Sequence, residues 1–283
     1  MHIVVCIKQV PDSAQIRVHP VTNTIMRQGV PTIINPYDLF ALEAALRLRD
    51  KHGGKITVLT MGPPMAEESL RRALSFGIDR AVLLTDRTFA GSDTLATSYA
   101  LSQAIGKIAE TFGAVDIVFT GKQTIDGDTA QVGPGIAKRL NLHQLTYVAA
   151  VRELNIDAGS ITVERRAEGG VQVLSTKLPC LITMLEGTNE IRRGSIDVAL
   201  SAARAEIVTW SAAAAGITEI AKCGLKGSPT VVKRVFAPPG RSEKAFQIDL
   251  TGLTSDAVAT SAIEEIFKRL PALEKELKQM AQV

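Results

Sequence analysis

The densest group of polar side chains in the sequence lies in residues 121–137, which read GKQTIDGDTAQVGPGIA. This stretch follows an apolar, β-branched run, VDIVFT at residues 115–120, and precedes a helix-like segment. The pattern predicts a loop from the carboxyl end of a strand to the start of a helix, where free backbone N–H groups bind anions in open α/β sheets. Its side chains offer enough donors and acceptors for a ribose and a pyrophosphate: Lys122, Gln123, Asp126, Asp128, Thr129 and Gln131.

The loop matches neither of the two commonest nucleotide-binding patterns, GxGxxG and GxxxxGKS/T. On these residues alone, a solvated loop between a strand and a helix is the alternative interpretation. Asp126 and Asp128 lack further ligands at calcium-loop spacing, so contacts to a ribose or near a phosphate suit them better than a metal ion. We expect Asp128 or Thr129 to cap the helix that follows.

Other residues that could bind a ligand lie at the ends of predicted strands. Lys8 follows the first apolar run, where an ordinary solvated lysine is the alternative. Met61 precedes Gly62, and it either packs on an adenine or fills the core. The four histidines have no serine or cysteine nucleophile in their sequence context, so a hydrolytic triad is not indicated.

Strand and helix signals alternate over the first 150 residues, which predicts an α/β fold with a doubly wound, mostly parallel sheet. Apolar runs predict strands at residues 3–7, 56–60, 81–85 and 115–120. Helices are predicted from a cap at Asn35 to Gly53, from about residue 65 to Gly77, and from a cap at Asp93 to Gly113.

The pattern changes after residue 145, where an antiparallel extension is predicted from runs at residues 147–155, 160–166, 171–174 and 180–185. A short helix containing Arg204 follows. The last helix spans residues 257–280 and breaks at Pro271, after a linker at Pro238-Pro239. We therefore expect an α/β domain at residues 1–210 and a C-terminal arm at residues 211–283, which either folds back on its own domain or wraps around a partner.

Composition excludes several classes of protein. The 32 basic and 29 acidic residues give a net charge of +3 with interspersed signs, so no nucleic-acid surface is indicated. Cys6, Cys180 and Cys223 lie far apart and predict buried thiols rather than a disulfide framework or a metal site. No segment approaches the ~18 apolar residues of a membrane span, and the N-terminus reads as a strand rather than a signal peptide, so we expect a cytoplasmic protein.

Five motifs in register resemble the β subunit of electron transfer flavoproteins. The longest is VERRAEGGVQVLSTKLPCLIT at residues 163–183, which follows that family's signature closely. The others are IKQVPD at residues 7–12, NP at 35–36, MGPP at 61–64 and GKQTIDGD at 121–128. The resemblance implies a Rossmann-like, adenine-nucleotide-binding fold and a heterodimer with an α subunit that carries an electron-transferring FAD.

The family implies two alternatives for the nucleotide of the β subunit. In housekeeping members the site holds a structural AMP, and electrons from dehydrogenases pass through the FAD of the α subunit. In the electron-bifurcating branch the same site holds a second FAD that accepts hydride from NADH. Its electrons then pass to an acyl-CoA dehydrogenase-type flavoenzyme and to a low-potential acceptor such as ferredoxin.

Two segments resemble the bifurcating, nitrogen-fixation-linked branch: DGDTAQVGP at residues 126–134 and FAGSDTLATS at residues 89–98. The AMP-binding form tends to carry another acidic residue where Gly127 stands, and its absence removes a charge near a diphosphate. The resemblance implies these cofactor-binding residues: Cys6, Lys8, Asn35, Met61, Gly62, Asp93, Thr94, Thr97, Gly121, Lys122, Gln123, Asp126, Gly127, Asp128, Thr129, Gln131 and Val132.

The loop that recognises partner dehydrogenases, expected within residues 184–204, departs from the family pattern. It reads NEIRR where the family usually has NEPRY, so we expect a freer backbone and an unusual partner. A mobile surface loop with one exposed isoleucine is the alternative. A third class, an adenine-nucleotide hydrolase or ligase, is disfavoured because the chain lacks an SGGxD-type loop near its start. The implied recognition residues are Asn189, Glu190, Arg192, Arg193 and Ile196.

Overall fold

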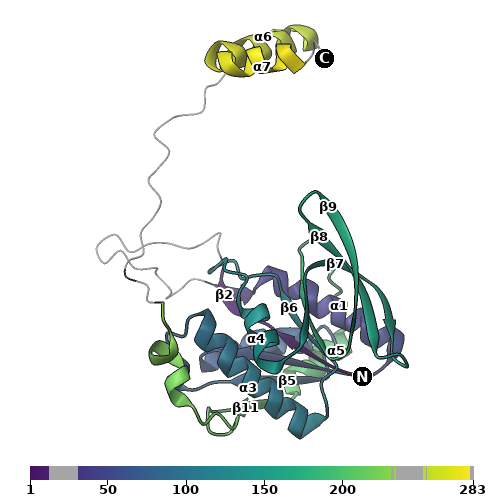
Figure 1. The fold of residues 1–283 in the computed structure, drawn as a ribbon, viewed down its shortest axis with the longest axis vertical. Coiled ribbons are helices and arrows are strands. Elements are labelled where there is room, and N and C mark those ends of the chain that lie inside the picture. Colours follow the sequence, from purple (N-terminus) through teal and green to yellow (C-terminus); the bar gives the residue numbers. More distant parts are fainter. Residues whose placement is uncertain (13–30, 231–232, 234–250, 253, 281–283) are drawn as a thin grey trace. The chain divides into compact units, whose positions relative to one another are not determined.

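A nine-stranded sheet runs through residues 1–236 in the computed structural model (Figure 1). The structure describes residues 1–12, 31–230, 233, 251–252 and 254–280. The strand order is β11-β5-β4-β1-β6-β10-β7-β8-β9. The strands are β1 (His2–Cys6), β4 (Lys55–Met61), β5 (Arg80–Leu84), β6 (Ile117–Gly121), β7 (His143–Asn155), β8 (Ser160–Ala167), β9 (Gly170–Lys177), β10 (Cys180–Met184) and β11 (Ile207–Trp210).

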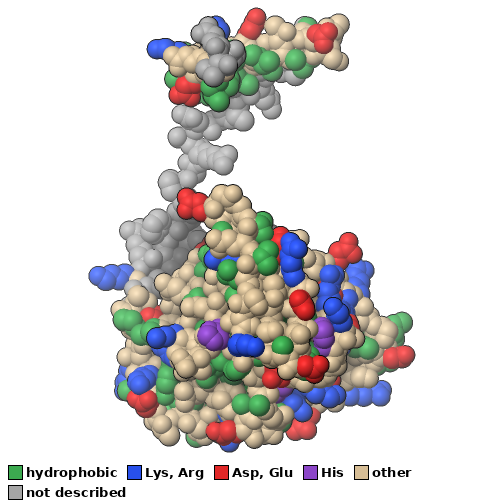
Figure 2. Space-filling view, turned by 45° about the vertical axis from the view of Figure 1, so that its right-hand side comes forward, with side chains coloured by type: hydrophobic (Ala, Val, Ile, Leu, Met, Phe, Trp, Pro, Cys, Tyr) green, Lys and Arg blue, Asp and Glu red, His purple; other side chains and the backbone are tan. Residues whose placement is uncertain are grey.

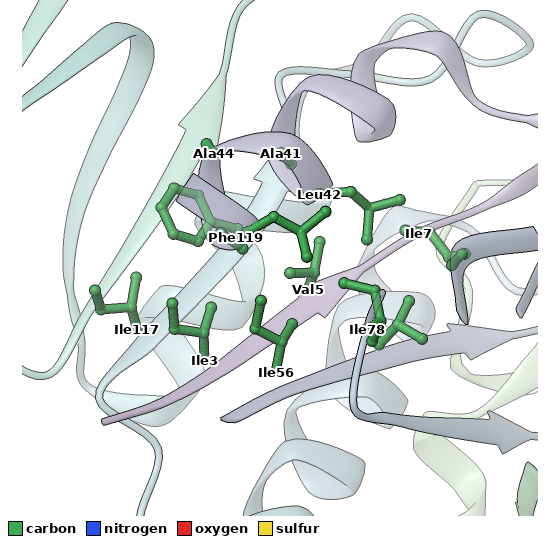
Figure 3. Packing of buried hydrophobic residues seen from close by; sticks show 14 of the residues in the cluster. Ile3, Val5, Ile7, Ala41, Leu42, Ala44, Ile56, Ile78, Ile117 and Phe119 are labelled. Carbon is green, nitrogen blue, oxygen red and sulfur yellow. The ribbon is translucent and has the colours of Figure 1, made fainter. Parts of the chain in front are cut away.

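Helices cover both faces of the parallel part of the sheet, and a separate apolar core fills each face. In Figure 3, Leu42 and Ala41 of α1 lie over Val5 and Phe119 of the sheet. Strands buried on both sides need apolar residues on both faces, which explains the continuous β-branched runs of β1 and β6. One face carries α1 (Pro36–His52), α2 (Glu67–Leu74) and α5 (Ile196–Arg204), and the other carries α3 (Thr94–Phe112) and α4 (Val132–Leu140).

The antiparallel extension is confirmed for β7, β8 and β9 but not for β10. Cys180 of β10 pairs with Ile117 of β6 and with His143 of β7, and both pairings are parallel. All five residues of β10 are buried, which is typical of an inner parallel strand. The prediction that residues 180–185 are antiparallel is therefore wrong, because it followed position in the chain rather than burial.

Several short elements were not predicted from the sequence. Strand β11 extends the sheet at its edge, parallel to β5. A separate ribbon pairs β2 (Gln9–Pro11) with β3 (Thr32–Ile34), and runs of three residues carry too little periodicity to be recognised. Single 3-10 turns occupy Pro64–Ala66, Arg87–Phe89, Ile220–Lys222 and Gly224–Gly227.

The first compact unit extends beyond residue 210. Ala212, Ile217 and Cys223 are buried in the second core cluster, and the division between the two units falls after Phe236. The boundary expected at residues 210 and 211 therefore lies inside the first unit, because small buried residues continue the core there.

The second unit, residues 237–283, contains the helices α6 (Ser255–Arg269) and α7 (Pro271–Met280). The break at Pro271 is confirmed, since proline cannot continue the backbone hydrogen bonding of the preceding helix. The expected Pro238-Pro239 linker lies outside the described residues. Among its described residues, six large apolar side chains are exposed: Ile263, Ile266, Leu270, Leu273, Leu277 and Met280.

Candidate functional site

Asp38 bridges two strands at the point where the chain changes its direction across the sheet. From β1 the chain first adds β4 and β5 on one side and then adds β6 on the other. Asp38 Oδ2 accepts a hydrogen bond from the backbone N–H of Lys8 at 2.8 Å, and Oδ1 accepts one from the N–H of Gly121 at 3.1 Å. Ligands of open α/β sheets bind in the crevice at such a switch point, outside the carboxyl ends of the strands.

Gly121 is required for this bridge, because a Cβ there would lie 2.5 Å from Asp38 Oδ1 and 2.7 Å from the Cβ of Tyr37. Asp38 itself is only 4% exposed. Burial raises the pKa of Asp38 to about 7, although the hydrogen bonds that its carboxylate accepts act in the opposite direction. A carboxyl group that titrates near neutrality therefore lies beneath the loop.

Asn35 fixes the loop that follows β6. Its Nδ2 donates to the carbonyl of Gln123 at 2.9 Å, and its Oδ1 accepts from the N–H of Ile125 at 3.1 Å. Asn35 is fully buried and occupies the cap position of α1, but its side chain makes no capping hydrogen bond. The expected capping role is therefore corrected: the amide serves the loop, and Pro36 supplies the favourable start of the helix.

Polar side chains hold the tip of the loop in place. Lys8 Nζ lies 2.8 Å from Asp126, and Gln123 Nε2 donates to Asp128 Oδ1 at 2.7 Å. Burial alone would raise the pKa of Asp126, but the hydrogen bond and charge of Lys8 lower it overall. Asp128 and Ala130 both have positive φ angles, 52° and 53°, so the backbone turns sharply where Thr129 is exposed.

The starts of α3 and α4 meet at this loop. Asp93 caps α3 as expected, accepting from the N–H groups of Leu95 and Ala96, and Thr97 lies in the first turns of the same helix. Thr94 Oγ1 donates to Gln131 Oε1 at 2.8 Å, which joins the two helix starts. Helix α4 begins at Val132 with Gln131 in the cap position, so the prediction that Asp128 or Thr129 caps it is wrong. The left-handed residues before Gln131 delay the start of the helix.

The remaining predicted residues also lie at this edge of the sheet. Met61 ends β4 and packs against the second core cluster, and Gly62 follows it. Cys6 ends β1, and burial raises the pKa of its thiol to about 12, so it stays protonated. Lys122 follows β6 at this edge, but its ammonium group lies 3.1 Å from Glu186, after β10, and 4.9 Å from the ring centre of Tyr37 in α1.

The predicted recognition residues precede and begin α5. Ile196 is the first residue of this helix and is 80% exposed, and Arg193 is also exposed. Arg192 instead forms ion pairs with Glu43 and Asp50, and Asn189 donates to the carbonyl of Phe40 at 3.0 Å. The carbonyl of Glu190 accepts from Arg47. The backbone expected to be freer without a proline is thus tied to α1 by side chains.

Within the described residues, no group of three or more His, Cys, Asp or Glu side chains could hold a metal ion. No described helix is long and apolar enough to cross a membrane. A cavity of about 390 Å³ lies between α3, α4 and the turn at Ile220–Lys222, but none of its lining residues belongs to the loop 121–131. Basic and acidic side chains are interspersed on the face of the first unit in Figure 2.

Three residues that shape this region were missed in the sequence. Asp38 and Glu43 are buried carboxylates in α1, and Glu186 follows β10. An acidic residue in the first turn of a helix is ordinary, so Asp38 carried no signal. The sequence did contain a signal for Glu43, which is a charged residue within the apolar stripe of α1. Carboxylates are rarely buried without a partner, so its position indicates an ion pair.

Comparisons with known proteins show the family of the chain. Residues 22–215 match the family described as the electron transfer flavoprotein domain. The chain is 74% identical to Protein FixA of Azorhizobium caulinodans over 281 residues, which cover 99% of each chain. It is 63% identical to Protein FixA of Azotobacter vinelandii, over 99% of this chain and 100% of the relative. Electron transfer flavoprotein subunit beta of Megasphaera elsdenii is 48% identical, over 86% of this chain and 89% of the relative.

Proposed function

Because the chain belongs to the electron transfer flavoprotein family, with relatives named as its β subunit and as FixA, we propose that it binds FAD at the switch point, at the carboxyl ends of β1 and β6. The observation that carries the proposal is the bridge of Asp38 between Lys8 and Gly121. It fixes the carboxyl ends of β1 and β6, where an adenine nucleotide binds in open α/β sheets. Asn35 attaches the adjoining loop to this edge by hydrogen bonds to the backbone of Gln123 and Ile125.

The residues of this edge suit the parts of a dinucleotide. The backbone of Cys6 at the end of β1, with Met61 and Gly62 at the end of β4, would hold the adenine. The N–H groups of the loop and the joined starts of α3 and α4 would bind the diphosphate, because helix starts favour anions. The residues assigned to the ribose and diphosphate are Lys8, Asp93, Thr94, Thr97, Gln123, Asp126, Gly127, Asp128, Thr129, Gln131 and Val132.

Gly127 supports FAD rather than AMP as the nucleotide. Among the described residues, a Cβ at this position would meet only Thr124 Oγ1, at 3.4 Å, so these residues do not themselves require glycine there. A carboxylate at this exposed position would place a negative charge beside the loop that we assign to the diphosphate. AMP, as a structural nucleotide in the same site, is the alternative that the experiments below distinguish.

The bound flavin would supply hydride acceptance from NADH and the transfer of single electrons. The side chains of this chain bind and orient it, and none of them acts as a covalent nucleophile. Electrons then pass to an acyl-CoA dehydrogenase-type flavoenzyme and to a low-potential acceptor such as ferredoxin. We place this activity in the cytoplasm, and the docking surface for the flavoenzyme at residues 189–204.

We propose that the second unit of this chain binds the α subunit. Its helices α6 and α7 expose an apolar row, with Ile263 at 50% and Leu270 at 56%. Rows of this kind are usually covered by a partner in soluble complexes. We therefore expect the chain to be poorly soluble when it is produced without the α subunit.

Co-production with the α subunit tests this function. The proposal predicts a one-to-one heterodimer whose flavin absorbance is bleached by NADH under anaerobic conditions. The chain produced alone serves as the control and should aggregate. A stable heterodimer whose flavins do not respond to NADH would reject the bifurcating assignment and leave the housekeeping alternative.

A further inference from the structure

Arg192 ties the start of α5 to α1 by a bidentate ion pair. Its Nε lies 2.8 Å from Glu43 Oε2, and its Nη2 donates to Glu43 Oε1 at 3.0 Å. Its backbone N–H also donates to Glu43 Oε2 at 3.2 Å, and its Nη1 lies 2.6 Å from Asp50. The carboxylate side chain of Glu43 is only 4% exposed, and bidentate pairs of this kind fix geometry as well as charge.

Two further contacts on α1 strengthen this attachment. Arg47 lies 2.9 Å from Glu43 Oε1 and donates to the carbonyl of Glu190 at 3.3 Å. Burial alone would raise the pKa of Glu43, but hydrogen bonds from Arg192 and Arg47 lower it overall. The carboxylate is therefore ionised at neutral pH, and removal of Arg192 would leave a buried charge with one partner fewer.

The other end of α5 is held by Arg71 of α2. Arg71 Nη1 donates to three carbonyls at the end of α5, those of Ala202, Ala203 and Ala205, at 3.1 to 3.3 Å. A cation at this end of a helix satisfies carbonyls that have no partner within the helix. Glu67 fixes the guanidinium of Arg71 at 2.7 Å.

Between these two attachments the chain is pressed against the end of α2. A Cβ at Gly194 would lie 1.9 Å from the carbonyl oxygen of Ser75, so the backbones touch there. The opposite side of α5 is open: Ile196 is 80% exposed and Leu200 is 52% exposed, one helical turn apart. The helix therefore packs on α2, the segment before it is tied to α1, and its apolar edge is exposed.

We infer that Arg192 and Arg71 are positioning residues that clamp α5 and the segment before it, so that Arg193 and Ile196 of the docking surface proposed above are held in one arrangement. The inference rests on the docking role proposed above, and it separates the five recognition residues into anchors and contacts. A helix that is already ordered holds Ile196 in one position, so less conformational entropy is lost on binding.

Hydrogen exchange of the α–β heterodimer tests the clamp without any flavoenzyme. Exchange in residues 189–204 should be at least about tenfold faster in Arg192→Gln and Arg71→Gln, because an opening free energy lower by about 1.4 kcal/mol is a tenfold change. Glu43→Gln, which removes the charge but not the shape, should act in the same direction. Arg193→Gln is the matched control and should exchange like the wild type.

Kinetics with an acyl-CoA dehydrogenase-type flavoenzyme supplies the second measurement. Arg192→Gln should raise the KM for the flavoenzyme severalfold with little change in kcat, and Arg192→Lys should recover part of it. Unchanged exchange in both arginine variants would overturn the clamp. Faster exchange with an unchanged KM would instead overturn the docking role of α5, so the two failures are distinguishable.

Discussion

The Oδ1 atom of Asp38 lies 3.1 Å from the backbone nitrogen of Gly121, and this hydrogen bond joins the first turn of α1 to the carboxyl end of β6. The two residues are 83 positions apart in the sequence. The bond lies beneath the loop that we assign to the cofactor, so the properties of Asp38 determine how that loop responds to pH and substitution.

The stability contributed by Asp38 should depend on pH. Its folded-state pKa is raised to about 7 from an ordinary value of 3.8, chiefly by burial. The folded protein therefore retains a proton that the unfolded chain loses, so this contribution is fully present below the unfolded pKa and is lost as pH rises through about 7. Urea midpoints of wild type and Asp38→Asn should show the wild type losing stability relative to the variant between pH 5 and 8. A difference that stays constant over this range would contradict the raised pKa.

Asn35→Ala should destabilise the loop more than an ordinary surface substitution. The change leaves the carbonyl of Gln123 and the N–H of Ile125 without their partner, at about 1–3 kcal/mol for each buried group left unsatisfied. Hydrogen exchange of residues 121–131 and the thermal midpoint measure the effect. Asn155→Ala is the matched control, because it removes an exposed hydrogen bond of 2.8 Å from the N–H of Ala158 to Asn155 Oδ1. Equal effects of the two variants would show that Asn35 does not fix the loop.

Gly127→Glu should leave the fold intact but exclude the second flavin. The position is exposed, and Thr124 Oγ1 is the only atom of the described residues that an added Cβ would contact, so the carboxylate meets little of its own chain. Flavin content of the heterodimer should fall from two FAD to one, with loss of NADH oxidation. Gly106→Glu, at a helical position with open space, carries the same charge and should keep both flavins. Retention of both flavins and of full activity by Gly127→Glu would rule out the proposed cradle.

Ile196→Asp should weaken docking without altering the cofactor. The side chain is 80% exposed, so its replacement removes an apolar contact with the flavoenzyme and costs little folding stability. Electron transfer to the flavoenzyme should slow at least about tenfold, in the range of 1–2 kcal/mol for an interface contact, while flavin content stays unchanged. Ile220→Asp, which is 43% exposed outside this segment, should transfer electrons at the wild-type rate. An unaltered rate in Ile196→Asp would remove this residue from the interface.

The parallel sheet was predictable because its strands carry continuous β-branched runs that only a doubly covered sheet requires. β10 carries the same run, yet its parallel pairing depends on insertion between β6 and β7, which no local pattern encodes. β2 and β3 are three residues each, too short for a period to appear.

The position of the site was predictable from the polar loop, but its construction was not. The roles of Asp38 and Asn35 arise from segments that the fold brings together, 83 and 88 positions apart. Asp128 and Ala130 adopt left-handed backbone conformations that glycine usually provides, so the sequence placed the helix start too early. The ion pair of Lys122 with Glu186 could not be predicted either, because it depends on the register of β10 beside β6.

The nucleotide content of the purified heterodimer tests the central claim most directly. Denaturation releases every non-covalent nucleotide, and chromatography against FAD and AMP standards gives the number of each per heterodimer. The account predicts two FAD and no AMP, with one FAD held at the carboxyl ends of β1 and β6. One FAD together with one AMP per heterodimer would contradict it.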